Sequence, residues 1–377
     1  MPNHSIHIDL SLPRSWDQCT TEQLETIAAC IMAHTAMADR FHPFDWEKVK
    51  SELFLLLAEI EIISTDTNPD DPEDTIYLCR KGRPDGSRPS SGGSSTPPRH
   101  SFLRRPWFRH GSKTPEFRLR PWQVQYWIDT QLKWLDDEKS TLIFFPYTHL
   151  IHIRHWQWKW PFIKKTYYTP SELLQDFTWQ QYRHLQDYMS MYIDIQNALV
   201  PLLSKSSSRT STSSSSSSGR SRTDAPADLS HIAQLQAEMT AARNEFLYIL
   251  FSPNSPSASP SDTPSSGRSR TDALYIRKKV ARITEVQWQV ILLWWSGMMH
   301  YLKDHYPRCF RSSSSKKKSK NPPNPLELYT SIVATMQKYI GIDEEKINNQ
   351  TFHVILEQLE RIAKENEEIE KINRKHK

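Results

Sequence analysis

The stretch from Ile283 to Tyr306, ITEVQWQVILLWWSGMMHYLKDHY, limits the possible folds of this chain more than any other part of it. Between Val290 and Met299 only Ser296 and Gly297 interrupt the apolar residues. A helix turns by about 100° per residue, so every side of a helix built from this run is hydrophobic. Because such a helix needs other elements around it, the sequence predicts a mainly α fold with this helix (283–306) at its centre.

The ends of the central helix carry residues that favour helix termini. Thr284 and Gln287 have the spacing of a capping box, and Pro307 ends the pattern. The apolar run is about half the roughly 20 residues that a membrane-spanning helix needs, and His300 and Lys303 follow it closely. We therefore expect a buried helix of a soluble protein and no membrane contact. The residues expected to be mostly buried are Trp288, Trp294 and Trp295; exposure of two of them would make the helix a docking surface instead.

Composition shows where the rest of the core lies. Only 37% of the 377 residues are hydrophobic. Ser, Pro, Gly and Arg gather in a few tracts, whereas the thirteen Trp, fourteen Tyr and fourteen Phe lie almost entirely outside them. Such tracts bury too little apolar surface to offset the entropy lost on ordering. We expect one sizeable helical core, with a small β-hairpin or sheet, interrupted by disordered Ser/Pro/Arg-rich insertions.

Residues 1–63 predict a strand followed by an antiparallel helical hairpin. Apolar and polar side chains alternate from Ile6 to Leu12, as on a half-buried strand. Thr20 and Gln23 form a capping-box pattern at the start of a helix that reaches about Ala38. Asp45 is placed to cap the next helix. The inward stripe of that helix comprises Val49, Leu53, Leu56 and Ile60.

Residues 64–112 have the composition of a disordered basic insertion, with a strand edge at Ile76–Cys79. Order returns in the aromatic-rich segment 113–203, where Pro121 suits the first turn of a helix. The stretches TLIFFPY and HLIHIRHWQWKWPF are rich in β-formers and predict two paired strands. The alternation of the second stretch slips near Arg154, which indicates a bulge or a break there.

Two helix starts follow these strands. The stretch Thr169–Glu172 combines an N-cap, a proline at the first position and a glutamate at the third, and Thr178 with Gln181 repeats the capping pattern. We expect a short helix that leads into a longer one. The apolar side of the longer helix comprises Tyr182, Leu185, Met189, Tyr192, Ile193 and Leu199.

The remainder alternates between linkers and helices. We expect disordered linkers at 204–230 and 253–273, a helix at 231–252, the central helix within 274–310, a basic linker at 311–324, and C-terminal helices with a charged tail at 325–377. The nonapeptide SSGRSRTDA occurs at Ser217–Ala225 and again at Ser265–Ala273. It is shorter than the repeats of about 20 or more residues that build solenoids. We interpret it as duplication in unconstrained segments; a partner-binding motif is the alternative.

Metal-binding and redox patterns are weak. His149, His152 and His155 diverge on either a strand or a helix, and no acidic residue lies nearby in sequence to orient them. The cysteines show neither CxxC spacing nor a histidine at zinc-finger distance; they are Cys19, Cys30, Cys79 and Cys309. We expect no metal site and no cofactor, and free thiols in a reducing compartment. MPNHSIHIDLSLPRSW lacks the features of a secretion signal, so we expect a cytoplasmic protein.

Catalytic motifs are not recognisable. The chain has no GxGxxG, Walker-type loop, GxSxG or HExxH. We therefore expect a protein that is not an enzyme and has no catalytic residues. An enzyme without a known motif is the alternative, and it requires a pocket with convergent polar groups.

Two features are compatible with binding of single-stranded nucleic acid. Trp156, Trp158 and Trp160 lie close to lysines, as in surfaces that stack bases. The tract Arg80–Arg120 (residues 80–120) carries eleven Lys or Arg against Asp85 and Glu116, and such a tract binds phosphates by counterion release. The other interpretation is packing and solvation. Eight of the thirteen tryptophans lie between residues 107 and 179, which indicates one aromatic-rich core, and the net charge is only +5.

The last predicted helix has a heptad rhythm. Its seam residues are Phe352, Ile355, Leu359, Ile362, Asn366, Ile369 and Asn373. Asparagines stand at two core-type positions and glutamates flank the seam, as in short coiled coils. A coiled coil with a partner and packing on the chain's own domain are both compatible with this pattern. We expect the first half to pack on its own domain and the charged tail after Lys364 to project into solvent.

Several helical fragments resemble a family of poorly characterised proteins encoded in tail modules of bacterial prophages. The fragments are LPRSWDQCTTEQLETIA, TPSELLQDFTWQQYRHLQDYM, VQWQVILLWWSGMMHYLKDHYPRCF, NPLELYTSIVATMQKYIG and LEQLERIAKENEEIEKINRKHK. The long Ser/Arg insertions depart from that family. The resemblance implies a cytoplasmic helical protein that assists or joins phage tail assembly, for instance as a chaperone of the tape-measure protein. Its partner would then be a tail component.

Overall fold

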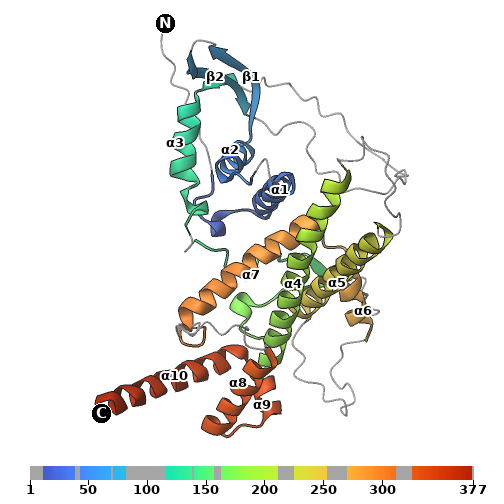
Figure 1. Ribbon diagram of the computed structural model, residues 1–377, viewed down its shortest axis with the longest axis vertical. Coiled ribbons are helices and arrows are strands. Elements are labelled where there is room, and N and C mark those ends of the chain that lie inside the picture. The colour runs from blue at the N-terminus through green and yellow to red at the C-terminus, as the bar shows by residue number, and fades with distance from the viewer. Residues whose placement is uncertain are drawn as a thin grey trace, which may run out of the picture. The chain divides into compact units, whose positions relative to one another are not determined.

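The computed structural model describes residues 12–38, 43–68, 71–81, 116–137, 140–156, 163–210, 225–252, 270–310 and 325–375. These residues are mainly helical with two small antiparallel sheets, as predicted (Figure 1). The chain divides into two compact units, Met1–Thr141 and Leu142–Lys377, so the expectation of one core is wrong. Among the described residues, no helix has the length and apolar character needed to cross a bilayer.

The first unit begins with the expected pair of helices, α1 (Thr21–Met37) and α2 (Trp46–Leu57). The side chain of Thr20 accepts from the Gln23 amide, and Gln23 Oε1 accepts from the Thr20 amide at 2.9 Å. The Asp45 carboxylate accepts from the first amides of α2, which confirms this cap as well. These bonds satisfy amides that a helix start leaves without an intrahelical partner.

The inward face of α2 differs in part from the predicted stripe. Val49 and Leu53 are fully buried, but Leu56 is 38% exposed and Ile60 already belongs to the following strand. Phe54 and Leu57 are buried instead. The buried face of α2 is therefore rotated towards Phe54 relative to the face that the sequence pattern predicted.

A three-stranded antiparallel sheet follows, with strand order β1-β2-β3. Its strands are β1 (Ile60–Asn68), β2 (Asp71–Lys81) and β3 (Glu116–Leu119). The hairpin of β1 and β2 occupies residues that we assigned to an insertion starting at 64, and β2 is the central strand, so Ile76–Cys79 is not an edge. Residues 82–115 lie outside the described part of the chain, as does the strand predicted at Ile6–Leu12, apart from Leu12.

The core of the first unit packs the sheet against the helices. The helix α3 (Pro121–Gln131) has Pro121 in its first turn, as predicted, and leads into the short 3-10 helix η2 (Lys133–Leu135). Trp134 is buried, contacts Trp16 edge to face at 4.9 Å, and donates its Nε1–H to the carbonyl oxygen of Pro13 at 2.9 Å. The buried cluster of this unit includes Ile27, Val49, Leu53, Phe54, Cys79, Phe117, Leu119, Ile128 and Leu132.

The second unit is built around α7 (Glu285–His305), with α4 (Trp179–Thr210), α5 (Ala225–Phe251) and α6 (Arg270–Val280). Thr284 and Gln287 form the predicted capping box. Trp288 is 0%, Trp294 1% and Trp295 5% exposed, which confirms that the helix is buried. Trp288 contacts Tyr192 of α4 and Phe246 of α5 edge to face, so neighbouring helices supply the surroundings that its apolar turns require (Figure 1).

The segment after Thr141 covers another side of α7. TLIFFPY forms no strand here, so that prediction is wrong. Trp294 donates its Nε1–H to the carbonyl oxygen of Ile143 at 2.8 Å, and Phe145 packs edge to face on the same indole. Gly297 lies so close to this segment that an added Cβ would overlap the Leu142 carbonyl. The carbonyl of Ile143 is thus bonded to a side chain of a helix and not to another strand.

The second sheet pairs β4 (Ile151–Trp156) with β5 (Ile163–Tyr168). The register is continuous from Ile151 opposite Tyr168 to Trp156 opposite Ile163, so the bulge or break predicted near Arg154 is wrong. The stretch Thr169–Glu172 leads only into the 3-10 helix η3 (Glu172–Leu174). Thr178 and Gln181 do form the predicted reciprocal pair before α4.

The apolar side of α4 is confirmed except at one position. Ile193 is 46% exposed, and Ile195 is buried instead. Helix α4 ends at Thr210 and helix α5 starts at Ala225, so both extend into the predicted linker 204–230. The two SSGRSRTDA copies each run into a helix start, at Ala225 of α5 and at Arg270 of α6. The rest of both copies, and the linkers 253–269 and 311–324, lie outside the described residues.

Three C-terminal helices complete the second unit: α8 (Pro325–Ile340), α9 (Glu344–Asn349) and α10 (Phe352–Lys375). The short α9 is an addition to the predicted pair. A bridge between Thr178 and Thr351 joins the starts of α4 and α10. In it, the Trp179 amide donates to the Gln350 carbonyl at 2.7 Å and the Phe352 amide donates to the Phe177 carbonyl at 3.0 Å.

Candidate functional site

The C-terminal half of α10 carries exposed apolar side chains. In the first half, Phe352, Ile355 and Ile362 are buried, which confirms that this part packs on its own domain. From Lys364 onward every described residue is exposed except the half-buried Glu367, as predicted for the tail. Ile369 and Ile372 are each 55% exposed. Figure 1 shows α10 extending beyond α8 and α9 towards the C-terminus.

Two ion pairs hold one side of α10 in the described structure. Arg308, just after α7, lies 2.7 Å from Glu360 and 3.3 Å from Glu367. The Glu360 carboxylate also accepts from the backbone amides of Arg308 and Cys309 at 2.9 and 3.2 Å. Glu367 and Ile369 are about 200° apart around the helix. The face that carries these two ion pairs is therefore opposite to Ile369.

One of the two seam asparagines is bonded within the domain. Tyr339 of α8 donates its hydroxyl hydrogen to Asn366 Oδ1 at 3.1 Å. Beyond this point the seam continues without cover in the described structure. We name the exposed end the α10 tail surface and define it as Ile369, Ile372 and Asn373.

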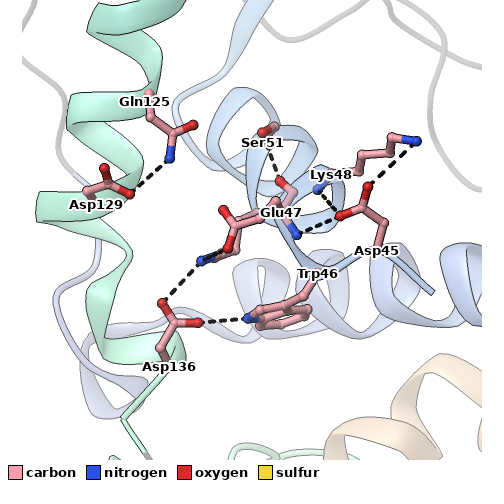
Figure 2. A network of polar contacts seen from close by, with 9 residues as sticks. Asp45, Trp46, Glu47, Lys48, Ser51, Gln125, Asp129 and Asp136 are labelled. Carbon is pink, nitrogen blue, oxygen red and sulfur yellow. Dashed lines mark hydrogen bonds and ion pairs between the residues drawn. The ribbon is translucent and has the colours of Figure 1, made fainter. Parts of the chain in front are cut away.

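The first unit contains a buried lysine, Lys50, whose two acidic partners, Glu47 and Asp136, are labelled in Figure 2. The Lys50 side chain is 7% exposed, and its Nζ lies 2.7 Å from Glu47 Oε1 and 3.2 Å from Asp136 Oδ2. Trp46 donates its Nε1–H to the other oxygen of Asp136 at 2.8 Å. Burial lowers the pKa of Lys50, but its hydrogen bonds to Glu47 and Asp136 outweigh that effect and raise it. The group stays an ammonium ion at neutral pH, so it serves as a clamp and not as a nucleophile.

A shallow polar depression of about 500 Å³ lies beside this clamp. Its lining residues are Arg14, Thr130, Gln131, Lys133, Trp134, Asp136 and Asp137. They offer charged groups, the amide of Gln131 and the hydroxyl of Thr130 to a polar ligand. The interpretation of an enzyme without a known motif stays an alternative.

Three side chains of the types that ligate metals lie together, although we expected no metal site. Cys30 and His34 lie one turn apart on α1, and Glu52 faces them from α2. Their ligand atoms all lie within 4.8 Å of one another. Sequence reasoning missed this group because it looked for zinc-finger spacings; the signal was the separation of four residues between Cys30 and His34 inside a predicted helix.

The histidines of the β4 region gather on one aromatic ring. His149 and His152 contact Tyr167 with ring centroids 4.7 and 5.9 Å away. The His155 side chain lies outside the described part, so the divergence of the three histidines stays a prediction.

The nucleic-acid features lie mostly outside the described residues. This holds for Trp158, Trp160 and the side chain of Trp156, and for the tract 80–120 apart from its two ends. At one end Arg80 pairs with Glu61 at 2.7 Å. Single-strand binding stays a prediction. The expectation of one aromatic core is wrong, because the described tryptophans of that region divide between the two units and Trp122 is 61% exposed.

The four cysteines are free thiols in the structure. Burial raises the pKa of Cys30 and Cys309 to about 12, with smaller contributions from the charges of Glu52 and Glu360 respectively. Burial raises that of Cys19 to about 12 as well, with a smaller contribution from Asp17. As metal-free groups these thiols are weak nucleophiles at neutral pH.

Comparison of the chain with protein-family models, with curated proteins and with solved structures gives no match. The functional argument therefore rests on the geometry of the chain itself and on the resemblance of its helical fragments.

Proposed function

We propose that this chain is a non-enzymatic, cytoplasmic assembly protein of a prophage tail module, and that its α10 tail surface docks on a helix of a tail component. The observation that carries the proposal is the heptad seam of α10, which continues for two turns beyond the point where its own domain covers it. The resemblance of the helical fragments to prophage tail-module proteins supports the choice of partner.

Apolar burial supplies the driving force for docking. Ile369 and Ile372 are each 55% exposed. Full burial of an isoleucine contributes about 1.5–3 kcal/mol, so covering these two contributes about 1 kcal/mol each. This is modest, and it fits a reversible contact of an assembly factor better than a permanent subunit interface.

Polar groups around the seam define the partner. Asn373 at a core-type position favours a partner helix that offers a polar group at the same level. Exposed glutamates, Glu365, Glu368 and Glu370, flank the seam, and Glu370 is paired with Arg374 at 3.3 Å. The best partner is therefore an amphipathic helix with Lys or Arg beside its apolar stripe, since charges beside a seam select the partner.

Co-expression with the proteins of the tail module tests the proposal. The tagged wild-type chain is expected to retain one tail component on an affinity column, and the double variant Ile369→Ser/Ile372→Ser should retain at least tenfold less. The matched control is Lys364→Ser/Lys371→Ser, which changes two exposed residues on another face of the same helix. Circular dichroism of each variant shows that α10 stays helical.

Three outcomes would overturn the proposal. One is a wild-type chain that elutes as a lone monomer under co-expression. Another is equal retention by the isoleucine variant and the lysine control. The third is a homodimer that the isoleucine variant abolishes, which would assign the α10 tail surface to a second copy of this chain.

A further inference from the structure

Three side chains that ligate metals meet between α1 and α2. Cys30 lies inside the hairpin and is 5% exposed. The side chains of His34 and Glu52 are 22% and 53% exposed, and His34 Nε2 lies 2.7 Å from Glu52 Oε2. Sγ, Nε2 and the carboxylate oxygen together enclose a small volume, with no two of them more than 4.8 Å apart.

The local fold holds these donors in place. A separation of four residues puts Cys30 and His34 on the same face of α1. Both helices are capped at their starts, and their contact is filled by Ile27, Val49 and Leu53, each fully buried. The site therefore stands on two rigid elements, which is what a defined coordination geometry requires.

The donor set matches zinc. Thiolate, imidazole and carboxylate are the ligands that Zn²⁺ takes in proteins, at about 2.3 Å for sulfur and about 2.0–2.2 Å for nitrogen or oxygen. Ligands around one such ion are about 3–4 Å apart. The observed separations, from 2.7 Å between His34 and Glu52 to an upper limit of 4.8 Å, bracket this range.

We propose that Cys30, His34 and Glu52 bind one Zn²⁺ ion, with a water molecule as fourth ligand on the solvent side. The metal replaces the thiol proton of Cys30, which leaves to solvent, and it replaces the direct contact between His34 and Glu52. A bound ion ties α1 to α2 and stabilises the first unit, since metal binding to a folded site adds to the free energy of folding. This site lies in the first unit and is independent of the α10 tail surface.

Metal titration of the full-length chain tests the site. Zinc is titrated against a chromophoric chelator, and cobalt(II) is used as a spectroscopic substitute whose thiolate-to-metal charge-transfer band reports on coordination by cysteine. The wild-type chain is expected to bind one ion that Glu52→Gln and Cys30→Ser bind at least tenfold more weakly. The cobalt band should vanish in Cys30→Ser.

Matched controls separate loss of a ligand from loss of folding. Cys79→Ser replaces another buried thiol of the same unit, and Glu22→Gln replaces an exposed carboxylate on α1; both should bind as the wild type does. Glu52 is exposed, so Glu52→Gln decides the matter even if Cys30→Ser fails to fold. A wild-type chain that takes no zinc from the chelator, or a Glu52→Gln variant with unchanged zinc affinity, would overturn the proposal in favour of a plain ion pair between His34 and Glu52.

Discussion

At Gly297 a single hydrogen atom is all that the packing accommodates. The residue is buried in α7, and a methyl group there would meet the backbone of Leu142. Backbone atoms cannot rotate away as the end of a long side chain can. Gly297 therefore sets how closely the segment 142–147 approaches the helix.

We predict that Gly297→Ala lowers the free energy of unfolding by about 1–3 kcal/mol, the usual cost of overpacking. This holds although alanine in a helix interior is favoured over glycine by about 1 kcal/mol. Urea denaturation followed by circular dichroism measures the change. Ser296→Ala, at the exposed neighbouring position, is the control and should stay within about 0.5 kcal/mol of the wild type. Equal stability of the two variants would contradict the close approach of Leu142.

Single residues also show what the sequence could and could not predict. The caps at Thr20, Thr178 and Thr284 were predictable because donor and acceptor lie within four residues of each other. The exposure of Leu56 and Ile193 was not, because both have helical spacing and only the position of a neighbouring element decides which of two adjacent apolar residues is covered. The three proposed zinc ligands combine both cases. The proximity of Cys30 and His34 was predictable because they are four residues apart on one helix, whereas that of Glu52 depends on how α2 packs against α1.

Between elements, the charged clamp of Lys50 links α2 to Asp136 in the turn after η2. The ammonium group is buried, whereas Glu47 and Asp136 are partly exposed. Loss of one partner thus leaves a buried cation with a single anion, and solvent at the rim limits the cost.

We predict that Asp136→Asn destabilises the chain by about 1 kcal/mol. The folded pKa of Lys50 is above its unfolded value, so the stabilisation is fully present below the unfolded pKa of 10.5 and is lost only as the pH rises through the higher folded value. The difference between variant and wild type should therefore be constant from about pH 6 to 9. Urea denaturation at several pH values measures it. Asp129→Asn, which changes an exposed carboxylate on α3, is the control; an equal loss in both variants would contradict the clamp.

The helices and strands differed in how well the local sequence pattern predicted them. The helices were predictable because apolar periodicity and caps agree. The hairpin of β1 and β2 was not, because its residues, STDTN and DPEDT among them, have the polar composition of a loop and are held by antiparallel backbone pairing. TLIFFPY shows the opposite error: its side chains favour a strand, but the carbonyl of Ile143 bonds to the indole of Trp294.

At the level of the whole molecule, the chain consists of two units with a boundary after Thr141. Among the described residues, the core of the first unit takes its members from that unit, from Leu12 to Leu135. A core that is complete within one segment is the condition for that segment to fold alone.

We predict that Met1–Thr141, expressed by itself, unfolds cooperatively on heating. A shorter fragment, residues 1–113, is the control, because it lacks β3 and α3 and with them Phe117, Leu119, Ile128 and Leu132 of the core. It should show no cooperative transition. Circular dichroism melting distinguishes the two, and a gradual, featureless melt of the longer fragment would contradict the division into units.

Buried thiols make the whole molecule sensitive to alkali. The pKa of Cys19, Cys30 and Cys309 is raised by burial to about 12, against 9.0 for an unperturbed thiol. Unfolding then lets each thiol ionise above pH 9, so the stabilisation is fully present below that pH and is lost as the pH rises towards 12.

We predict that the urea midpoint of the reduced, metal-free chain falls as the pH rises from about 9 to 11. Buried tyrosines act in the same direction, since burial also raises the pKa of Tyr306 to about 12. The Cys309→Ala variant isolates the contribution of one thiol and should show a shallower fall than the wild type. Parallel curves for variant and wild type would contradict an ionisation-resistant Cys309.

The bridge between Thr178 and Thr351 determines when the second unit can finish folding during synthesis. The first turn of α4 is synthesised early, yet the carbonyl that receives the Trp179 amide belongs to Gln350. Contacts between residues so distant in sequence form late, because the intervening chain must be made and its loop closed first. The first unit can complete its fold while the nascent chain is still growing. The second unit cannot complete its fold until α10 has been synthesised. Until then the first turn of α4 lacks its bridge partner and is accessible to folding factors.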